Sequence, residues 1–232
     1  MYATFLSRAF DQVNLDVGLH GQPVIFCLDR AGITGPDGAS HHGILDMALL
    51  SKVPGMTILA PSSYQELQQM LHDAFEITTG PVAIRYPRTA APSVAESEVG
   101  SGLRGRKTQS GTDVCFLAVG KMLDAATDAA KLLEEDGVSS TIWDVRSVKP
   151  LDPDMLADAA THPLVITVED GIRSGGAGSA IQDRISSMSG ITPPVSILGV
   201  PTEYIPHGDP GDILHELGLD AAGIVAHVRD LR

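Results

Sequence analysis

Short apolar runs alternate with amphipathic segments along the whole 232-residue chain, and this alternation constrains the fold more than any other feature. Each run is too short for a buried helix and is typical of a buried strand. Strands that alternate with helices favour parallel sheets, so we predict an α/β fold of two three-layer domains with mostly parallel sheets. The predicted strands are 23–28, 56–60, 81–87, 113–119, 139–145, 164–170 and 195–200.

The segments between these strands carry the apolar spacing of helices. The first predicted helix covers 4–17, and Ser62 or Ser63 is expected to cap a later helix that runs to Ile77. Glu66 would complete a capping box from Ser63. The remaining predicted helices are 44–51, 121–136, 153–160, 178–188 and 220–231.

A small, polar stretch at 89–112, rich in Gly and Ser, interrupts the alternation and shows no sustained period. Such a composition is typical of a boundary between domains. We therefore predict a first domain at 1–90, a linker at 91–112 and a second domain at 113–232.

The formal net charge of −13 argues against nucleic acid or an anionic membrane as a partner, because binding to phosphates needs a basic face. Anionic small molecules need only a few local Arg, Lys or N–H groups. Cys27 and Cys115 lie in apolar runs, which favours two buried free thiols in a reducing cytoplasm. No apolar run approaches the roughly 18–20 residues of a membrane span, so a cytoplasmic location is expected.

The segment 29–43 carries the densest set of polar side chains and follows a predicted buried strand. Ligands bind at such strand ends in parallel sheets. Arg30 can grip a phosphate or carboxylate as a fork, and His41 can exchange protons near neutral pH. A solvated surface loop is an equal alternative. Adjacent residues rarely bind one ion, so His41 and His42 do not predict a metal site.

Two further motifs follow predicted strands. RYPR at 85–88 places Arg85 and Arg88 beside the segment 29–43 only if the two strands are neighbours, and the alternative is two surface arginines. SGGAGSA at 174–180 lacks the pattern of a P-loop or of a dinucleotide-binding turn, which favours a tight turn over a phosphate cradle.

Two further groups of residues also have a structural alternative. Glu169 and Asp170 precede the Gly-rich turn and are interpreted as a solvated carboxylate pair rather than a strand-end site. Tyr2 and Phe5 share one face of the first helix with Arg8, and ordinary core packing is favoured for the two aromatic side chains when they are considered alone.

Taken together, several motifs resemble the 1-deoxy-D-xylulose-5-phosphate synthase family, which are thiamine-diphosphate-dependent relatives of transketolase. The resemblance runs in register along the whole chain and implies most of a pyrimidine-binding (transketolase central) domain followed by a transketolase C-terminal domain. The motifs are YATFLSRAFDQV, PVIFCLDRAGITGPDGASHHG, MTILAPSS, GPVAIRYPR, VRSVKPLD, VEDGIRSGGAGSA and VPTEYIPHGDPGDILHELGLDAAGI.

The resemblance implies roles for matching residues. Phe5 would stack on the aminopyrimidine of thiamine diphosphate, with Arg8 close to it. The substrate pocket would be lined by Tyr2, Arg30, Asp37, His41 and Arg88. Arg30 and Arg88 would hold the phosphate of glyceraldehyde 3-phosphate, and His41 would transfer a proton while pyruvate condenses with that aldehyde and loses carbon dioxide.

The sequence also departs from the family pattern. The Gly-Asp-Gly motif that helps to bind Mg²⁺ and the diphosphate is absent, and Asn14 is the only asparagine. The activating glutamate of the family lies upstream of the Tyr-x-Thr-Phe helix, and this sequence starts at Met1. We therefore expect a C-terminal part of the synthase that binds only the pyrimidine end of the cofactor.

Three hypotheses follow from these departures. In the first, the chain acts in a homo-oligomer, typically a homodimer, or in a complex with a separate chain that carries the diphosphate-binding domain. In the second, it is a non-catalytic fragment or remnant, or the product of a truncated gene model, with a role in folding or dimerisation only. In the third, it is a regulatory module that uses SGGAGSA to bind a phosphorylated ligand.

Overall fold

The computed structural model describes residues 1–232 and contains two sheets. In the first sheet, of order β1-β3-β2-β7, the strands β1, β3 and β2 are parallel and β7 pairs antiparallel with β2. These strands are β1 (Ile25–Asp29), β2 (Thr57–Leu59), β3 (Val82–Tyr86) and β7 (Ser147–Lys149).

The second sheet has the order β4-β6-β5-β8-β9 and is parallel apart from β4. Its strands are β4 (Arg106–Gln109), β5 (Val114–Ala118), β6 (Ser140–Asp144), β8 (Val165–Ile172) and β9 (Val195–Val200). The α/β fold with mostly parallel sheets is therefore confirmed.

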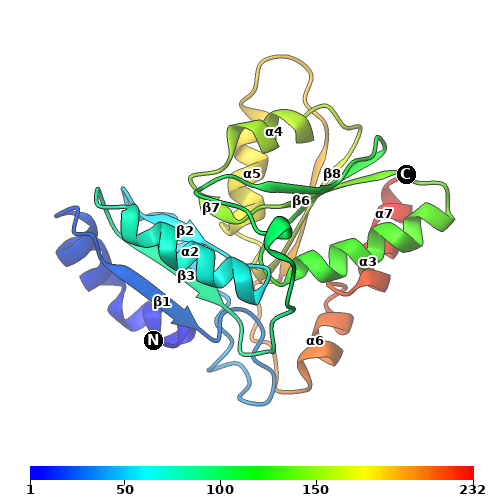
Figure 1. Cartoon of the computed structure of the whole chain (residues 1–232). Helices are drawn as coiled ribbons and strands as arrows, with labels where there is room; N and C mark the ends of the chain where they lie inside the picture. The colour runs from blue at the N-terminus through cyan, green and yellow to red at the C-terminus, as the bar shows by residue number, and fades with distance from the viewer.

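Helices cover both faces of the first sheet (Figure 1). Apolar side chains of α2 pack on one face, and those of the two N-terminal helices pack on the other. The elements are η1 (Ala3–Ala9, a 3-10 helix), η2 (Gln12–Gly18, a π-helix), α1 (Asp46–Leu50) and α2 (Tyr64–Glu76).

The second sheet is covered in the same way (Figure 1). Side chains of β5 alternate, so that Phe116 packs towards α3 and α7 while Leu117 packs towards α4 and α5. The helices of this half are α3 (Met122–Glu135), α4 (Pro153–Ala159), α5 (Ala177–Ser186), α6 (Pro210–Glu216) and α7 (Ala221–Leu231). No helix in the chain is long and apolar enough to cross a membrane.

Several elements differ from the predictions. The predicted helix 4–17 is a 3-10 helix followed by a π-helix rather than a regular α-helix. Strand β4 lies inside the predicted linker 91–112, and its polar residues pair with β6 at the edge of the second sheet, where apolar alternation is not required. The prediction did not include β7 or α6, and the predicted boundaries between domains stay a prediction.

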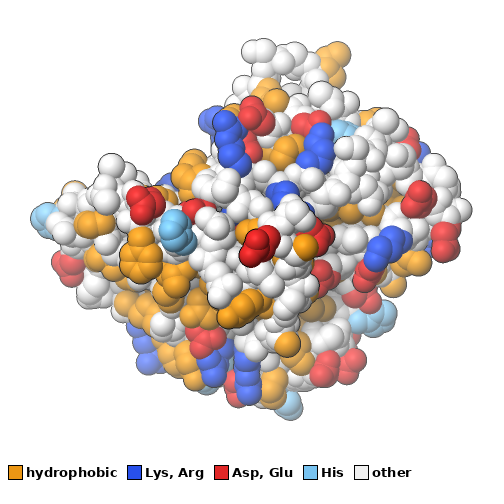
Figure 2. All heavy atoms as spheres, viewed as in Figure 1, with side chains coloured by type: hydrophobic (Ala, Val, Ile, Leu, Met, Phe, Trp, Pro, Cys, Tyr) orange, Lys and Arg blue, Asp and Glu red, His pale blue; other side chains and the backbone are white.

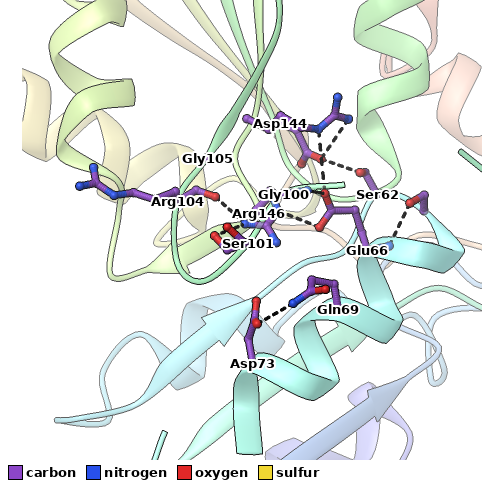
Figure 3. Close-up of polar contacts among 12 residues, drawn as sticks. Ser62, Glu66, Gln69, Asp73, Gly100, Ser101, Arg104, Gly105, Asp144 and Arg146 are labelled. Atoms are coloured by element: carbon purple, nitrogen blue, oxygen red, sulfur yellow. Dashed lines mark hydrogen bonds and ion pairs between the residues drawn. The ribbon is translucent and has the colours of Figure 1, made fainter. Parts of the chain in front are cut away.

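Glu66 does not close the predicted capping box. Ser63 does cap α2, because its Oγ accepts a hydrogen bond from the N–H of Glu66 at 3.1 Å. The Glu66 carboxylate instead accepts from Arg146 Nε at 2.7 Å and from the N–H of Gly100 at 2.6 Å (Figure 3). A fully buried carboxylate needs partners of this kind, and the second half of the chain supplies one of them.

The two cysteines have different surroundings. Cys115 is buried in the second sheet, whereas Cys27 is exposed, so the prediction that both are buried is wrong for Cys27. The reason is topological, because Cys27 lies on β1 at the edge of the first sheet. Both thiols are free.

Apolar side chains also remain exposed on α2. Tyr64, Leu71 and Phe75 lie on its outer surface, and Figure 2 shows hydrophobic side chains over this helix. The inner face of α2 carries Met70 and Ala74, which pack on the first sheet.

Phe116→Ala should lower the free energy of unfolding by about 3–5 kcal/mol, because a fully buried aromatic side chain leaves a cavity that its neighbours close only in part. Phe75, at 68% exposure, provides the matched control, and Phe75→Ala should change that free energy by less than about 1 kcal/mol. Urea unfolding followed by circular dichroism measures both variants. Equal losses would contradict the packing described for Phe116.

Candidate active site

The first sheet brings the two predicted arginine segments together. Strands β1 and β3 are parallel neighbours, with Asp29 in register with Tyr86, and the N–H of Ala31 donates to Tyr86 O at 3.0 Å. Arg30 and Arg88 therefore follow the carboxyl ends of adjacent strands. The two strands that precede these segments are therefore neighbours, which the sequence alone did not establish.

An aromatic cluster lies beside these strand ends. The rings of Tyr2 and Phe5 are stacked, with centroids 5.6 Å apart and an interplanar angle of 8°. His41 meets the Phe5 ring edge-on at 5.5 Å. The guanidinium carbons of Arg30 and Arg8 lie 3.9 Å from the Tyr2 centroid and 5.8 Å from the Phe5 centroid, respectively. Five of the seven predicted site residues therefore form one group.

The other two predicted residues form an ion pair at the surface. Arg88 Nη1 donates to Asp37 Oδ2 at 3.3 Å, and both side chains are about half exposed. Arg30 likewise pairs with its neighbour Asp29 and has a left-handed backbone with φ of 58°. Both guanidinium groups thus keep solvent access beside a carboxylate. An incoming phosphate would compete with those carboxylates for the same N–H donors.

Charged side chains gather at this end of the molecule. Figure 2 shows basic and acidic groups side by side along the lower margin, where the loop 29–43 lies in Figure 1. The chain carries a net charge of −13, so the arginines of the site provide local positive charge on an acidic protein.

The loop is also attached to the second half of the chain. His42 is buried, with Nδ1 accepting from the N–H of Thr34 at 3.1 Å and Nε2 within 3.2 Å of Pro206 O. The N–H of Gly208 donates to Gly35 O at 3.3 Å. His42 therefore supports the loop, while its neighbour His41 faces the aromatic cluster. No group of three or more His, Cys, Asp or Glu side chains is placed to hold a metal ion.

Phe5 keeps part of its ring exposed to solvent. Phe5 is 39% exposed, whereas Ala3 and Leu6 of the same helix are buried, so the interpretation of Phe5 as ordinary core packing is wrong. Aromatic rings stack in offset or edge-on geometry, and Tyr2 and His41 already contact Phe5 in these two ways. Phe5 and Arg8 therefore both keep solvent access within this cluster.

Arg85 is not a surface residue. It is 3% exposed, and its Nε donates to Asp46 Oδ2 at 2.9 Å while its Nη1 donates to Asp170 Oδ1 at 2.7 Å. Lys121 Nζ lies 3.3 Å from Asp170 Oδ2. One sequence signal pointed to this network, because a charged residue within the apolar strand VAIRY requires a buried partner.

The two carboxylates of this network differ. Burial raises the pKa of Asp46, and Arg85 offsets this only in part. Burial acts on Asp170 as well, but Arg85 and Lys121 together outweigh it and lower the pKa of Asp170. The interpretation of Glu169 and Asp170 as a solvated pair is wrong, since both are fully buried.

The side chain of Glu169 lies against the Gly-rich turn at 174–180. Its carboxylate oxygens accept from the N–H groups of Ala177 and Gly178 at 3.0 and 2.7 Å, at the start of α5. A Cβ on Gly176 would lie 2.4 Å from Glu169 Oε2. The amides that could cradle a phosphate are therefore bound within the chain, and the glycines allow the close approach of Glu169. This favours the tight-turn interpretation of SGGAGSA.

Two family models match the chain. The pyrimidine-binding domain of transketolase matches residues 1–93, and the C-terminal domain of transketolase matches residues 104–224. The chain belongs to the transketolase family.

Within that family, the chain is similar to 1-deoxy-D-xylulose-5-phosphate synthases, which confirms the resemblance noted from its motifs. It is 45% identical to the synthase of Chlorobium luteolum, over 99% of this chain and 37% of that relative. The synthase of Magnetococcus marinus is 42% identical, over 100% of this chain and 38% of its own length. The chain thus spans well under half the length of these curated relatives.

Solved structures give the same picture. A split-gene transketolase, described as an inactive β4 tetramer, superposes with a TM-score of 0.89 at 31% identity, over 99% of this chain and 74% of that chain. A transketolase variant from Pichia stipitis has a TM-score of 0.82 at 18% identity, over 99% of this chain and 33% of its own, which is a likeness of fold alone.

The buried Glu169 should make stability depend on pH. Burial raises its pKa from 4.5 to about 7, although the two N–H donors oppose this. The folded state therefore binds the Glu169 proton more tightly than the unfolded state does, and this proton binding stabilises the fold. The stabilisation is complete below the pKa of the unfolded state and is lost as pH rises through the pKa of the folded state. The unfolding free energy of wild type, taken relative to that of Glu169→Gln, should fall by about 2 kcal/mol from about pH 5 to pH 8.

Urea unfolding at several pH values measures this difference. Glu135→Gln changes an exposed carboxylate on α3 and serves as the control, with no such pH-dependent difference. A difference for Glu169→Gln that stays constant with pH would contradict the expectation.

Proposed function

We propose that this chain forms the pyrimidine- and substrate-binding part of a 1-deoxy-D-xylulose-5-phosphate synthase. That enzyme condenses pyruvate with glyceraldehyde 3-phosphate and releases carbon dioxide, a step towards isoprenoid, thiamine and pyridoxal precursors. The observation that carries the proposal is the grouping of Tyr2, Phe5, Arg30 and His41 at the ends of β1 and β3.

Arg30 and Arg88 are the proposed phosphate-binding residues. Each presents a guanidinium fork with solvent access, and such a fork matches the paired oxygens of a phosphate. Asp37 would hold Arg88 in place when the substrate is absent, and Asp29 would do the same for Arg30. When substrate binds, each arginine would exchange its carboxylate partner for the dianionic phosphate. The two arginine side chains would then be held in place around the bound aldehyde.

Phe5 and Arg8 are the proposed residues for the pyrimidine end of thiamine diphosphate, and Tyr2 belongs to the proposed substrate pocket beside them. When bound, this cofactor supplies the electron sink that lets pyruvate lose carbon dioxide. Phe5 would orient the pyrimidine ring by stacking, and Arg8 would lie near it. Tyr2 carries Arg30 on its ring at 3.9 Å and so would couple the cofactor side to the phosphate side.

His41 is the proposed proton-transfer residue. Its Nδ1 is 2.8 Å from Ser40 Oγ, which fixes the ring orientation and leaves Nε2 as the nitrogen that would exchange a proton with substrate. The edge-on contact with Phe5 keeps the imidazole ring close to the proposed pyrimidine-binding side.

The diphosphate and Mg²⁺ are proposed to be bound by further polypeptide, in the same assembly and in the cytoplasm. Two observations support this: the chain covers 37% of the synthase of Chlorobium luteolum, and its described residues include no metal-binding group. The similar structure described as a split-gene transketolase is a precedent for a transketolase encoded by a divided gene. We further propose a dimeric or higher assembly.

A second candidate is a chain that folds and assembles without activity. The description of the related split-gene structure as an inactive tetramer favours it. The two candidates differ in one measurement. The chain is mixed with a polypeptide that carries the diphosphate-binding domain, and carbon dioxide release from pyruvate is followed with thiamine diphosphate and Mg²⁺. Activity above that of either component alone supports the synthase, and its absence supports the second candidate.

In that mixture, Arg88→Met should raise the KM for glyceraldehyde 3-phosphate by about tenfold to a hundredfold, because one charge-assisted contact to the phosphate is lost. The KM for pyruvate should stay unchanged. Arg229→Met removes an exposed arginine that pairs with Asp136 on the second half, and it should change neither constant. A similar increase in both KM values for Arg88→Met would rule out a specific phosphate contact.

A further inference from the structure

The Arg85 network connects the two halves of the chain. Arg85 lies on β3 of the first sheet, Asp46 begins α1, and Asp170 lies on β8 of the second sheet. Both carboxylates are 1% exposed, so neither can exchange its partner for water. With Lys121 the network holds two positive and two negative groups and is close to neutral.

Asp170 reaches the base of the loop 29–43. A Cβ placed on Gly32 would lie 1.7 Å from Asp170 Oδ2, so the carboxylate fills the space that any other residue would need there. Gly32 also has a φ of 77°, which favours glycine. The Asp170 side chain therefore rests directly on the backbone of the loop.

The two ends of the loop are joined at the same place. Gly32 and Gly43 exchange reciprocal backbone hydrogen bonds, each of 2.8 Å. Beyond Gly43, the N–H of Ile172 donates to Ile44 O at 2.8 Å, and Asp46 follows at the start of α1. Arg85 thus contacts one carboxylate at each end of the loop, through Asp170 against Gly32 and through Asp46 after Gly43.

We propose that Arg85 is a positioning residue, which fixes the two ends of the loop 29–43 and so holds the phosphate-binding side of the site in place. This inference rests on the proposed function for its catalytic consequence. His41 lies between Gly32 and Gly43, and Arg30 lies two residues before Gly32, whereas Arg88 follows the end of β3, the strand that carries Arg85. A displacement of the loop would therefore separate the two phosphate-binding arginines.

The chain offers a matched comparison in Arg146. This residue is also fully buried at the junction of the two halves, where it donates to Glu66 and to the carbonyl oxygens of Ser101, Gly102 and Arg104 (Figure 3). None of these partners belongs to the loop 29–43. Loss of Arg146 should weaken the fold without changing the loop locally.

Amide hydrogen exchange of the full chain, resolved by NMR, tests this role without any need for activity. In Arg85→Met, exchange at the amides of Gly32 and Gly43 should accelerate by about tenfold or more relative to that of Phe116, which reports global unfolding. In Arg146→Met the same normalised rates should stay within about twofold of wild type. Equal normalised rates in the two variants would overturn the proposal.

Arg85→Lys provides a second variant for the same measurement if Arg85→Met does not fold. A lysine retains the charge but presents one ammonium group in place of the fork, so it cannot hold both carboxylates in the same way. It should accelerate exchange at Gly32 and Gly43 in the same pattern, and wild-type rates in Arg85→Lys would overturn the proposal.

The assembled enzyme adds a second measurement. Arg85→Lys should raise the KM for glyceraldehyde 3-phosphate by about tenfold with a smaller effect on kcat, and Arg146→Lys should not. An assembly without any activity would refute the proposed function, while the exchange rates would still decide the role of Arg85.

Discussion

Buried ion pairs between the two halves of the chain are the interaction on which the site depends. Arg85 and Arg146 each take a guanidinium group into the interior and pair it with a carboxylate from the other half. Removal of one partner from such a pair costs about 3–5 kcal/mol, because the remaining charge stays buried. An apolar contact between the halves would tolerate sliding, whereas a fixed fork of hydrogen bonds defines their relative placement.

The first sheet then converts this placement into a site. Because β1 and β3 are parallel neighbours, two loops that are distant in sequence leave the sheet side by side. The strand order therefore places Arg30 and Arg88 at the same edge of the sheet. The second half contributes contacts to the loop 29–43 and none of the seven predicted site residues. His42 reaches Pro206 and Asp170 reaches Gly32, so the loop 29–43 is supported from behind while its other surface faces solvent.

Sequence periodicity predicted the sheets well, since strands buried on both faces must be apolar runs. It failed where polar groups are buried. Glu169 and Asp170 were expected in solvent, because a sequence cannot show that backbone N–H groups and an arginine from another strand will satisfy them. β4 was missed because an edge strand can be polar. The site residues were named from resemblance, and the structure adds their grouping, while their chemical roles stay predictions.

Strand β7 shows how closely the two halves are joined. It belongs by sequence to the second half, yet it forms the end of the first sheet, against β2. A polypeptide divided anywhere in 91–112 would leave its N-terminal piece with β2 as an unpaired edge, and open edges of this kind recruit strands from other molecules. Recombination that exchanged one half for that of a relative would have to match this shared strand, so the two halves are expected to evolve as one inherited unit.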